Sequence, residues 1–195
     1  MKTLDFIFLL GLSSSLLSAS PSDKETPLKE IREIGEKSST QLLKTLGKNM
    51  KQHMKSGGAL EALDFCTNQA YTLTESVNAK LPKGVSVKRI SAKYRNPTNQ
   101  PSADELAVLE IFENMKKANI VLPKALVQKR QDHLYKYYKP LVIEKKVCLK
   151  CHGHNINAEV KKEIVNRYPQ DSAINYKLHD LRGAIVVEID KRVKQ

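Results

Sequence analysis

A five-residue segment near the C-terminal end, Cys148-Leu149-Lys150-Cys151-His152, constrains the fold of this 195-residue chain more than any other segment. Two cysteines three positions apart, followed directly by histidine, form the pattern that covalent attachment of a c-type haem requires. Each thiol adds to a haem vinyl group, and the imidazole then becomes the proximal ligand of the iron. The segment therefore predicts one covalently attached haem c, held by Cys148 and Cys151, with His152 as the proximal ligand.

Zinc binding and thiol redox chemistry are the two alternatives for this segment. A structural zinc site needs four ligands, and although His154 is close, no second Cys or His pair follows at a suitable distance. A thioredoxin-like site has its cysteine pair near the start of a βαβ unit, whereas this pair comes late and follows a tyrosine-rich stretch. Haem attachment is the interpretation that the spacing favours.

The first twenty residues are typical of a secretory signal peptide. Lys2 precedes an apolar run from Phe6 to Leu17, and small residues follow it at Ser18, Ala19 and Ser20. The run is short for a bilayer span, which disfavours an uncleaved anchor. Bacteria attach haem to c-type cytochromes outside the cytoplasmic membrane, so both features predict a periplasmic protein with no membrane span after cleavage.

Hydrophobic periodicity predicts helices first and strands mainly in the second half. Helical spacing or capping signals mark residues 28–54, 59–80, 102–117 and 157–168. Alternation and β-branched runs predict a strand with a bulge over 85–94, one or two strands over 134–147, and a strand over 183–189. The expected architecture is an α+β domain, in which a small antiparallel sheet is backed by long N-terminal helices.

The chain length supports one exported domain after the signal peptide, with a core of useful size. The expected organisation is a signal peptide over 1–20, an N-terminal helix over 21–57 that ends at Gly57-Gly58, and a haem domain over 58–195.

The formal net charge of +12 comes from 33 Lys and Arg against 21 Asp and Glu. The lysines are dispersed along the chain, whereas nucleic-acid binding favours a basic stripe interleaved with aromatic residues. No nucleic-acid partner is expected. The charge fits a solvated lysine-rich surface, with docking to an acidic partner or anionic lipid as the alternative.

The third cysteine, Cys66, is left over once the haem takes two. It lies on the apolar face of the helix expected over 59–80, so its side chain should point inward, either as a small buried hydrophobe or as the second axial ligand of the iron. A vacant position open to gas is another interpretation. Other side chains that could reach an iron are Met50, Met54, Met115, His53, His133, His154 and His179.

Four segments occur in the order of a known family: Arg95-Asn96-Pro97-Thr98-Asn99-Gln100-Pro101 with Glu105, Cys148 to Gly153, Tyr168-Pro169-Gln170-Asp171-Ser172-Ala173, and Tyr176 with Asp180-Leu181-Arg182-Gly183-Ala184. Over residues 58–189 the chain resembles the single-haem c-type family with a PAS-like fold. The resemblance implies a PAS-like antiparallel sheet, one covalent haem, and axial ligation by His and Cys. Cys66 is the residue that matches the family's ligating cysteine. The family occurs alone and as the sensory portion of membrane signalling proteins.

Two functions fit these expectations. The first is a redox or gas sensor that responds to NO, CO or O2 and passes a change at the Cys66 helix to a signalling partner. The second is a soluble electron carrier whose basic surface steers a redox partner. No catalytic constellation is evident beside the haem, so enzymatic activity is not expected. Arg95, Tyr176 and Arg182 could hold the haem propionates, although Arg95 could equally brace its loop. The long first helix could form a homodimer.

Overall fold

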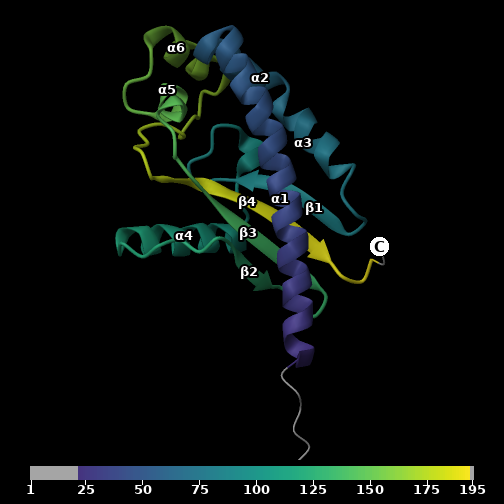
Figure 1. The fold of residues 1–195 in the computed structure, drawn as a ribbon. Coiled ribbons are helices and arrows are strands. Elements are labelled where there is room, and N and C mark those ends of the chain that lie inside the picture. Colours follow the sequence, from purple (N-terminus) through teal and green to yellow (C-terminus); the bar gives the residue numbers. More distant parts are fainter. Residues whose placement is uncertain (1–21, 194–195) are drawn as a thin grey trace, which may run out of the picture.

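A four-stranded antiparallel sheet in the order β1-β4-β3-β2 lies at the centre of the fold (Figure 1). Its strands are β1 (Val85–Ile90), β2 (Leu126–Lys129), β3 (Leu134–Val142) and β4 (Leu181–Asp190). The computed structural model describes residues 22–193, so the signal peptide expected over 1–20 lies outside the described residues. The helices are α1 (Ser22–Ser56), α2 (Gly58–Asn68), α3 (Ala70–Asn78), α4 (Ala103–Lys117), α5 (Leu149–His152) and α6 (Ala158–Arg167), with short 3-10 turns η1 (Pro97–Asn99) and η2 (Lys146–Cys148). The α+β class with long N-terminal helices is confirmed.

Helices cover both faces of the sheet. Figure 1 shows α1 running across the strands, and its apolar residues form the larger core with α2, α3 and one face of the sheet. Alternate residues of β4 belong to different cores: Ile185 and Val187 pack toward α1, whereas Ala184 and Val186 pack toward α4. The helix expected over 21–57 is thus part of the same core as the sheet.

Local capping signals place several helix ends where the sequence predicts them. The Ser102 N–H donates to the Glu105 carboxylate at 3.0 Å, as the predicted capping box requires. The Asn157 side chain accepts from the Glu159 N–H at 2.9 Å and begins α6. The first helix ends at Ser56, before the glycine pair. These predictions are confirmed.

The single helix predicted over 59–80 is wrong, because the chain divides into α2 and α3 at Gln69. Gln69 has φ −122° and ψ −30°, outside helical values. The two halves have different neighbours, since α2 contacts α6 and α5 while α3 contacts β1. The break lets each half follow its own packing surface.

The bulge predicted in the strand over 85–94 is also wrong. β1 ends at Ile90 and pairs with β4 without a register shift, so Ala92 and Tyr94 lie beyond it. The apolar phase changes because Val87 faces the α1 side of the sheet while Ile90 faces α4. A strand covered on both faces does not keep a single alternation.

The register irregularity lies instead between β3 and β4. Leu141 pairs with Gly183 and Val142 pairs with Leu181, so the register skips Arg182. A skipped residue reverses which face the following side chains occupy. Leu181 therefore joins the α4-side core, and Arg182 turns toward the opposite side.

Two further differences concern the stretch before the haem motif. Strand β2 was not predicted, and β3 ends at Val142 rather than continuing toward Val147, which lies in η2.

No helix within residues 22–193 combines the length and apolarity that crossing a bilayer needs.

Candidate functional site

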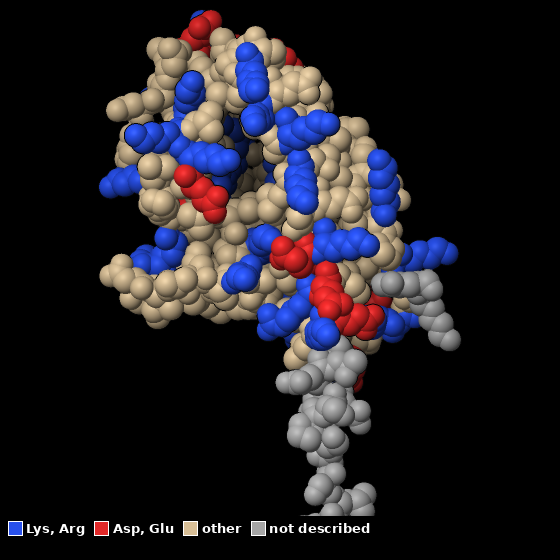
Figure 2. Space-filling view, in the orientation of Figure 1, with Lys and Arg blue, Asp and Glu red and all other residues tan. Residues whose placement is uncertain are grey.

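A cavity of about 360 Å³ lies where α1, α2, α5 and the ends of β1, β3 and β4 meet. Figure 2 shows the molecule hollowed in this region, with Lys and Arg side chains around the opening. The residues that line it are Met50, Met54, Ala62, Leu63, Cys66, Arg89, Arg95, Asn96, Asn99, Leu141, Val142, Ile143, Val147, Cys148, Cys151, His152, Tyr168 and Arg182. Most predicted site residues therefore face one space.

The attachment segment forms η2 and the single turn α5 at one wall of the cavity. The Cys148 N–H donates to the Lys145 carbonyl at 3.0 Å, and the Cys151 Sγ lies 3.9 Å from the Ala59 carbonyl at the start of α2. Burial raises the pKa of the Cys151 thiol. The turn therefore presents two thiols and the imidazole of His152 to the same cavity.

Gly153 ends this turn with close backbone packing. Its N–H donates to the Leu149 carbonyl at 2.9 Å, and a Cβ at this position would lie 2.6 Å from the same oxygen. A side chain at residue 153 would therefore push the turn open, immediately after His152.

One hydrogen bond sets the tautomer of His152. Its Nδ1 lies 2.7 Å from the carbonyl oxygen of Ala173, and because a carbonyl only accepts, Nδ1 carries the proton. Nε2 is then the nitrogen with a free lone pair, as in metal-ligating histidines held by a backbone carbonyl. Burial, together with the charges of Arg182 and Arg95, holds the pKa of His152 well below its usual value. The imidazole is neutral at neutral pH, which is the form that binds metal ions.

Cys66 reaches the cavity from α2, so a residue far from the attachment segment in the sequence lines the same space. It packs against the α1-side core, as the inward orientation predicted from the helical face requires. Burial raises the pKa of its thiol, and the charge of Arg89 opposes that shift. All three cysteines are free thiols.

Among the other ligand candidates, only the thioethers of Met50 and Met54 also line this cavity. Met115 packs in the α4-side core, and the His53 ring stacks on Phe65 with its Nδ1 2.9 Å from the Glu61 carboxylate. His133, His154 and His179 do not line the cavity either. Within residues 22–193, no three His, Cys, Asp or Glu side chains gather closely enough to hold a metal ion by themselves.

Arg95 lines the cavity and also braces the loops around it. Its Nε and Nη2 donate to the two oxygens of Asp171 at 3.1 and 3.0 Å, and Nη2 lies 2.7 Å from the Cys151 carbonyl. The Arg95 and Asp171 side chains are 8% and 6% exposed, so this is a buried, bidentate ion pair. The carboxylate already neutralises Arg95, which favours the bracing role that the sequence left open.

Arg182 and Tyr176 form a stack beside His152. The Arg182 Nη1 donates to the Ser91 hydroxyl at 2.6 Å, and its guanidinium carbon lies 5.4 Å from the Tyr176 ring centre. The Tyr176 ring meets the His152 ring edge to face, with centres 6.2 Å apart. Tyr176 is not among the residues that line the cavity, and its contact with the site is this packing against His152.

Arg89 is the cavity residue that the sequence interpretation missed. It lies opposite Ile185 on the α1-facing side of β1, where the alternation of Val85 and Val87 would place a core residue. A charged side chain at a core position of a strand was the available signal, because such residues are buried only where something compensates the charge.

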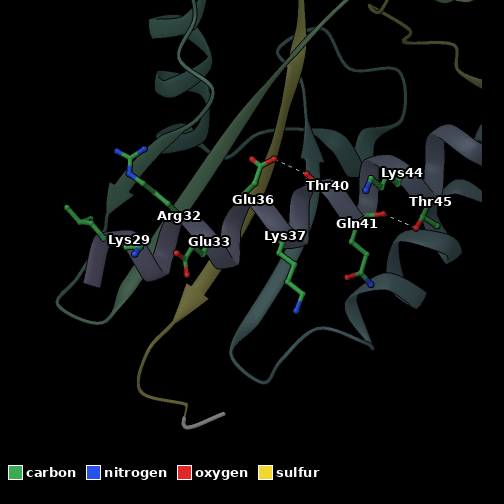
Figure 3. A pocket seen from close by; sticks show the side chains of 10 residues that line it. Lys29, Arg32, Glu33, Glu36, Lys37, Thr40, Gln41, Lys44 and Thr45 are labelled. Carbon is green, nitrogen blue, oxygen red and sulfur yellow. Dashed lines mark hydrogen bonds between the residues drawn. The ribbon is translucent and has the colours of Figure 1, made fainter. Parts of the chain in front are cut away.

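A larger and more open hollow of about 1300 Å³ runs along α1 (Figure 3). The described residues that line it, from Leu28 to Thr45, all belong to α1, and several are charged. The hydrogen bonds drawn there join neighbouring turns of the helix, such as Thr40 Oγ1 to the Glu36 carboxylate at 3.0 Å. Among the described residues, this flank of α1 brings no donors from a second element together.

The fold and the cavity together define an α+β domain in which thiols from two distant segments and one oriented imidazole face the same space. A family model described as Tll0287-like matches residues 24–190, and the chain belongs to this family.

A solved structure described as the cyanobacterial heme-protein Tll0287 has the same overall fold, with a TM-score of 0.54. It is 21% identical to this chain, and the match covers 91% of this chain and 99% of that protein. A comparison with the curated proteins finds no match. These comparisons do not test whether the sheet is PAS-like, so that description stays a prediction.

Proposed function

We propose that this chain is an exported haem protein that binds one c-type haem through Cys148 and Cys151, with His152 and Cys66 as the axial ligands of the iron, and that it acts as a redox or gas sensor. The observation that carries the proposal is that Cys66, from α2, lines the same cavity as the attachment segment. Membership of the Tll0287-like family and the likeness to a protein described as a heme-protein support it.

The thiols and the imidazole that line the cavity are the side chains that a c-type haem would need. One short segment brings the thiols of Cys148 and Cys151 and the imidazole of His152 to the cavity. The Ala173 carbonyl keeps this imidazole in the tautomer whose Nε2 can bind a metal ion. Haem supplies an iron that changes oxidation state and can exchange an axial ligand. The residues of this chain fix the imidazole and bring the Cys66 thiol of a second helix to the same cavity.

A sensor is favoured because Cys66 lies in α2 directly after Phe65, a residue of the α1-side core. Its neighbour Phe65 is 1% exposed and packs in the α1-side core, and the His53 ring of α1 stacks on Phe65 with centres 4.9 Å apart. A displacement of Cys66 would therefore move a side chain on which α1 packs. That is a physical route from the cavity to the surface helix.

Electron transfer is the second candidate, and the charge distribution favours it. The charged side chains around the hollow in Figure 2 are mainly basic, and the net charge of the chain is +12. An acidic redox partner would be steered to this face at low ionic strength. In this case both axial ligands stay in place through the redox cycle.

The ligand assignment is tested by Cys66→Ala, with Met54→Leu as the matched control from the same cavity. Loss of an anionic thiolate should shift the Soret band and raise the midpoint potential, because the thiolate stabilises the oxidised iron. Met54→Leu should leave both unchanged. Absorption spectra and a redox titration measure them, and an unchanged Cys66→Ala spectrum would remove Cys66 as a ligand.

Covalent attachment and the choice of function need two further measurements. Cys148→Ser and Cys151→Ser should each leave less haem bound to the denatured chain. Reduced wild-type protein should bind CO or NO if it is a sensor, since the iron–sulfur bond weakens on reduction or protonation. Failure to bind either gas would favour the electron carrier.

A further inference from the structure

Three arginines line the cavity, and they differ in how their charges are balanced. Arg95 is neutralised by the bidentate pair with Asp171. Arg182 donates to neutral acceptors, the Ser91 hydroxyl and the Lys93 carbonyl, and stacks on Tyr176. Hydrogen bonding therefore orients Arg182 without compensating its charge.

Arg89 is the least compensated of the three. Within residues 22–193 it has no ion-pair partner, and no Asp or Glu is among the described residues that line the cavity. The groups that favour its charged form are Cys66 and Tyr168, and burial raises the pKa of the Cys66 thiol. Burial also lowers the pKa of Arg89 itself.

Arg89 and Arg182 also repel each other across the cavity wall. Burial lowers the pKa of Arg182, and the nearby charges of Arg95 and Arg89 lower it further. Two guanidinium groups held in one apolar cavity without an acid are costly. A bound group that carries carboxylates would remove this cost, because each arginine forms charge-assisted hydrogen bonds to a carboxylate.

We infer that Arg89 binds a carboxylate of the group held in this cavity, a haem propionate, and so fixes its orientation relative to His152 and Cys66. This assignment rests on the proposed haem binding and adds to it a specificity residue on β1. It also separates the arginines by role: Arg95 braces the loops, and Arg89 contacts the ligand.

The test compares protohaem with its dimethyl ester, in which both carboxylates are blocked, on the haem-free full chain. Wild type should bind protohaem more tightly than the ester by about 10- to 100-fold, the range of a hydrogen bond to a charged group. Arg89→Gln should weaken protohaem binding by a similar factor and leave the ester affinity within about 2-fold. Haem-induced fluorescence quenching gives all four dissociation constants.

Arg32→Gln is the control, because it removes the same charge from an exposed position on α1. It should change neither affinity. Arg89→Lys keeps the charge and should recover part of the preference for protohaem. Far-ultraviolet circular dichroism checks that each variant is folded, and the wild-type preference tests the assignment even if Arg89→Gln does not fold.

Equal affinity of wild type for the two porphyrins, or equal losses for both in Arg89→Gln, would overturn the assignment of Arg89 while leaving haem binding intact. Wild-type protein that bound neither porphyrin would overturn haem binding together with it.

Discussion

The Arg95 side chain joins three segments that are far apart in the sequence. It contacts the Asp171 carboxylate and the carbonyl oxygens of Cys151 and Ala173, the last at 3.3 Å. Ala173 is the same residue whose carbonyl accepts from His152. One buried ion pair thus holds both the attachment turn and the group that sets the tautomer of the proximal imidazole.

Asp171→Ala should therefore destabilise the protein by about 3–5 kcal/mol, because it leaves the buried Arg95 guanidinium without its counter-ion. The control is Asp132→Ala, whose side chain is 99% exposed in its pair with Lys129 and whose loss should leave the stability nearly unchanged. Urea unfolding of both variants measures the difference. Similar free energies of unfolding for the two would show that the Arg95 pair contributes no more than a surface pair.

The residues that could be identified from the sequence were those with a local signature. The attachment cysteines and His152 are defined by spacing, and Cys66 by the face of its helix. Arg89 could not be assigned to the cavity this way, because its place depends on the pairing of β1 with a strand about 90 residues later. Arg182 reaches the cavity through a register irregularity that no local pattern in β4 indicates.

Helix α1 lies close to the sheet because of Gly35. A Cβ at Gly35 would lie 2.2 Å from the Tyr137 ring, so only glycine allows the helix to rest on this side chain. The Tyr137 hydroxyl then donates to the Glu36 carboxylate at 2.6 Å. The contact positions the helix that carries Met50 and Met54 into the cavity.

Gly35→Ala should destabilise the protein by about 1–3 kcal/mol, because Tyr137 and the backbone of α1 must move to admit the methyl group. Gly47 provides a matched control in the same helix, since a Cβ there meets nothing within 4 Å. Gly47→Ala should stabilise by about 0.5–1 kcal/mol through helix propensity alone. Thermal unfolding distinguishes the two, and a stabilising Gly35→Ala would contradict the close approach.

Helix and strand boundaries could also be predicted from the sequence only where a local signal sets them. The capping signals at Ser102 and Asn157 act within one turn, so the starts of these two helices could be predicted accurately. The break at Gln69 and the short strand β2 have no such signal. They depend on which surfaces α2 and α3 meet and on β3 as a partner, so they follow from tertiary packing.

An ionic cluster holds α4 against the sheet and links three elements of the fold. The Glu105 side chain is fully buried and accepts from Lys88 of β1 at 2.9 Å and from Lys136 of β3 at 3.0 Å. Lys136 also lies 3.1 Å from the Asp104 carboxylate. Burial raises the pKa of Asp104, but hydrogen bonds from Ser102 and Lys136 outweigh burial and lower this pKa to about 2. Burial likewise raises the pKa of Glu105, and hydrogen bonds from Ser102, Lys88 and Lys136 lower it.

This cluster should make stability fall in acid. Because the folded pKa of Asp104 lies below its ordinary value of 3.8, the unfolded chain takes up the proton first, and stability is lost as pH falls from about 4 toward 2. Asp104→Asn should reduce the loss between pH 5 and pH 2 by about 1 kcal/mol, after allowance for solvent screening. Glu110→Gln, an exposed change on the same helix, should leave the slope unchanged. Denaturant unfolding at several pH values measures it, and parallel slopes for wild type and Asp104→Asn would contradict the coupling.

The strand order has a consequence for how the chain is completed during synthesis. β4 is the last strand to be made, yet it lies in the middle of the sheet and is the strand with which β1 pairs. About 90 residues must therefore be made after β1 before β4 can pair with it and complete the α1-side core next to Arg89. Such long-range pairing is slow to form. The attachment turn at Leu149–His152 thus precedes in the chain the strand that supplies Arg182, so its cavity cannot close until β4 has joined the sheet.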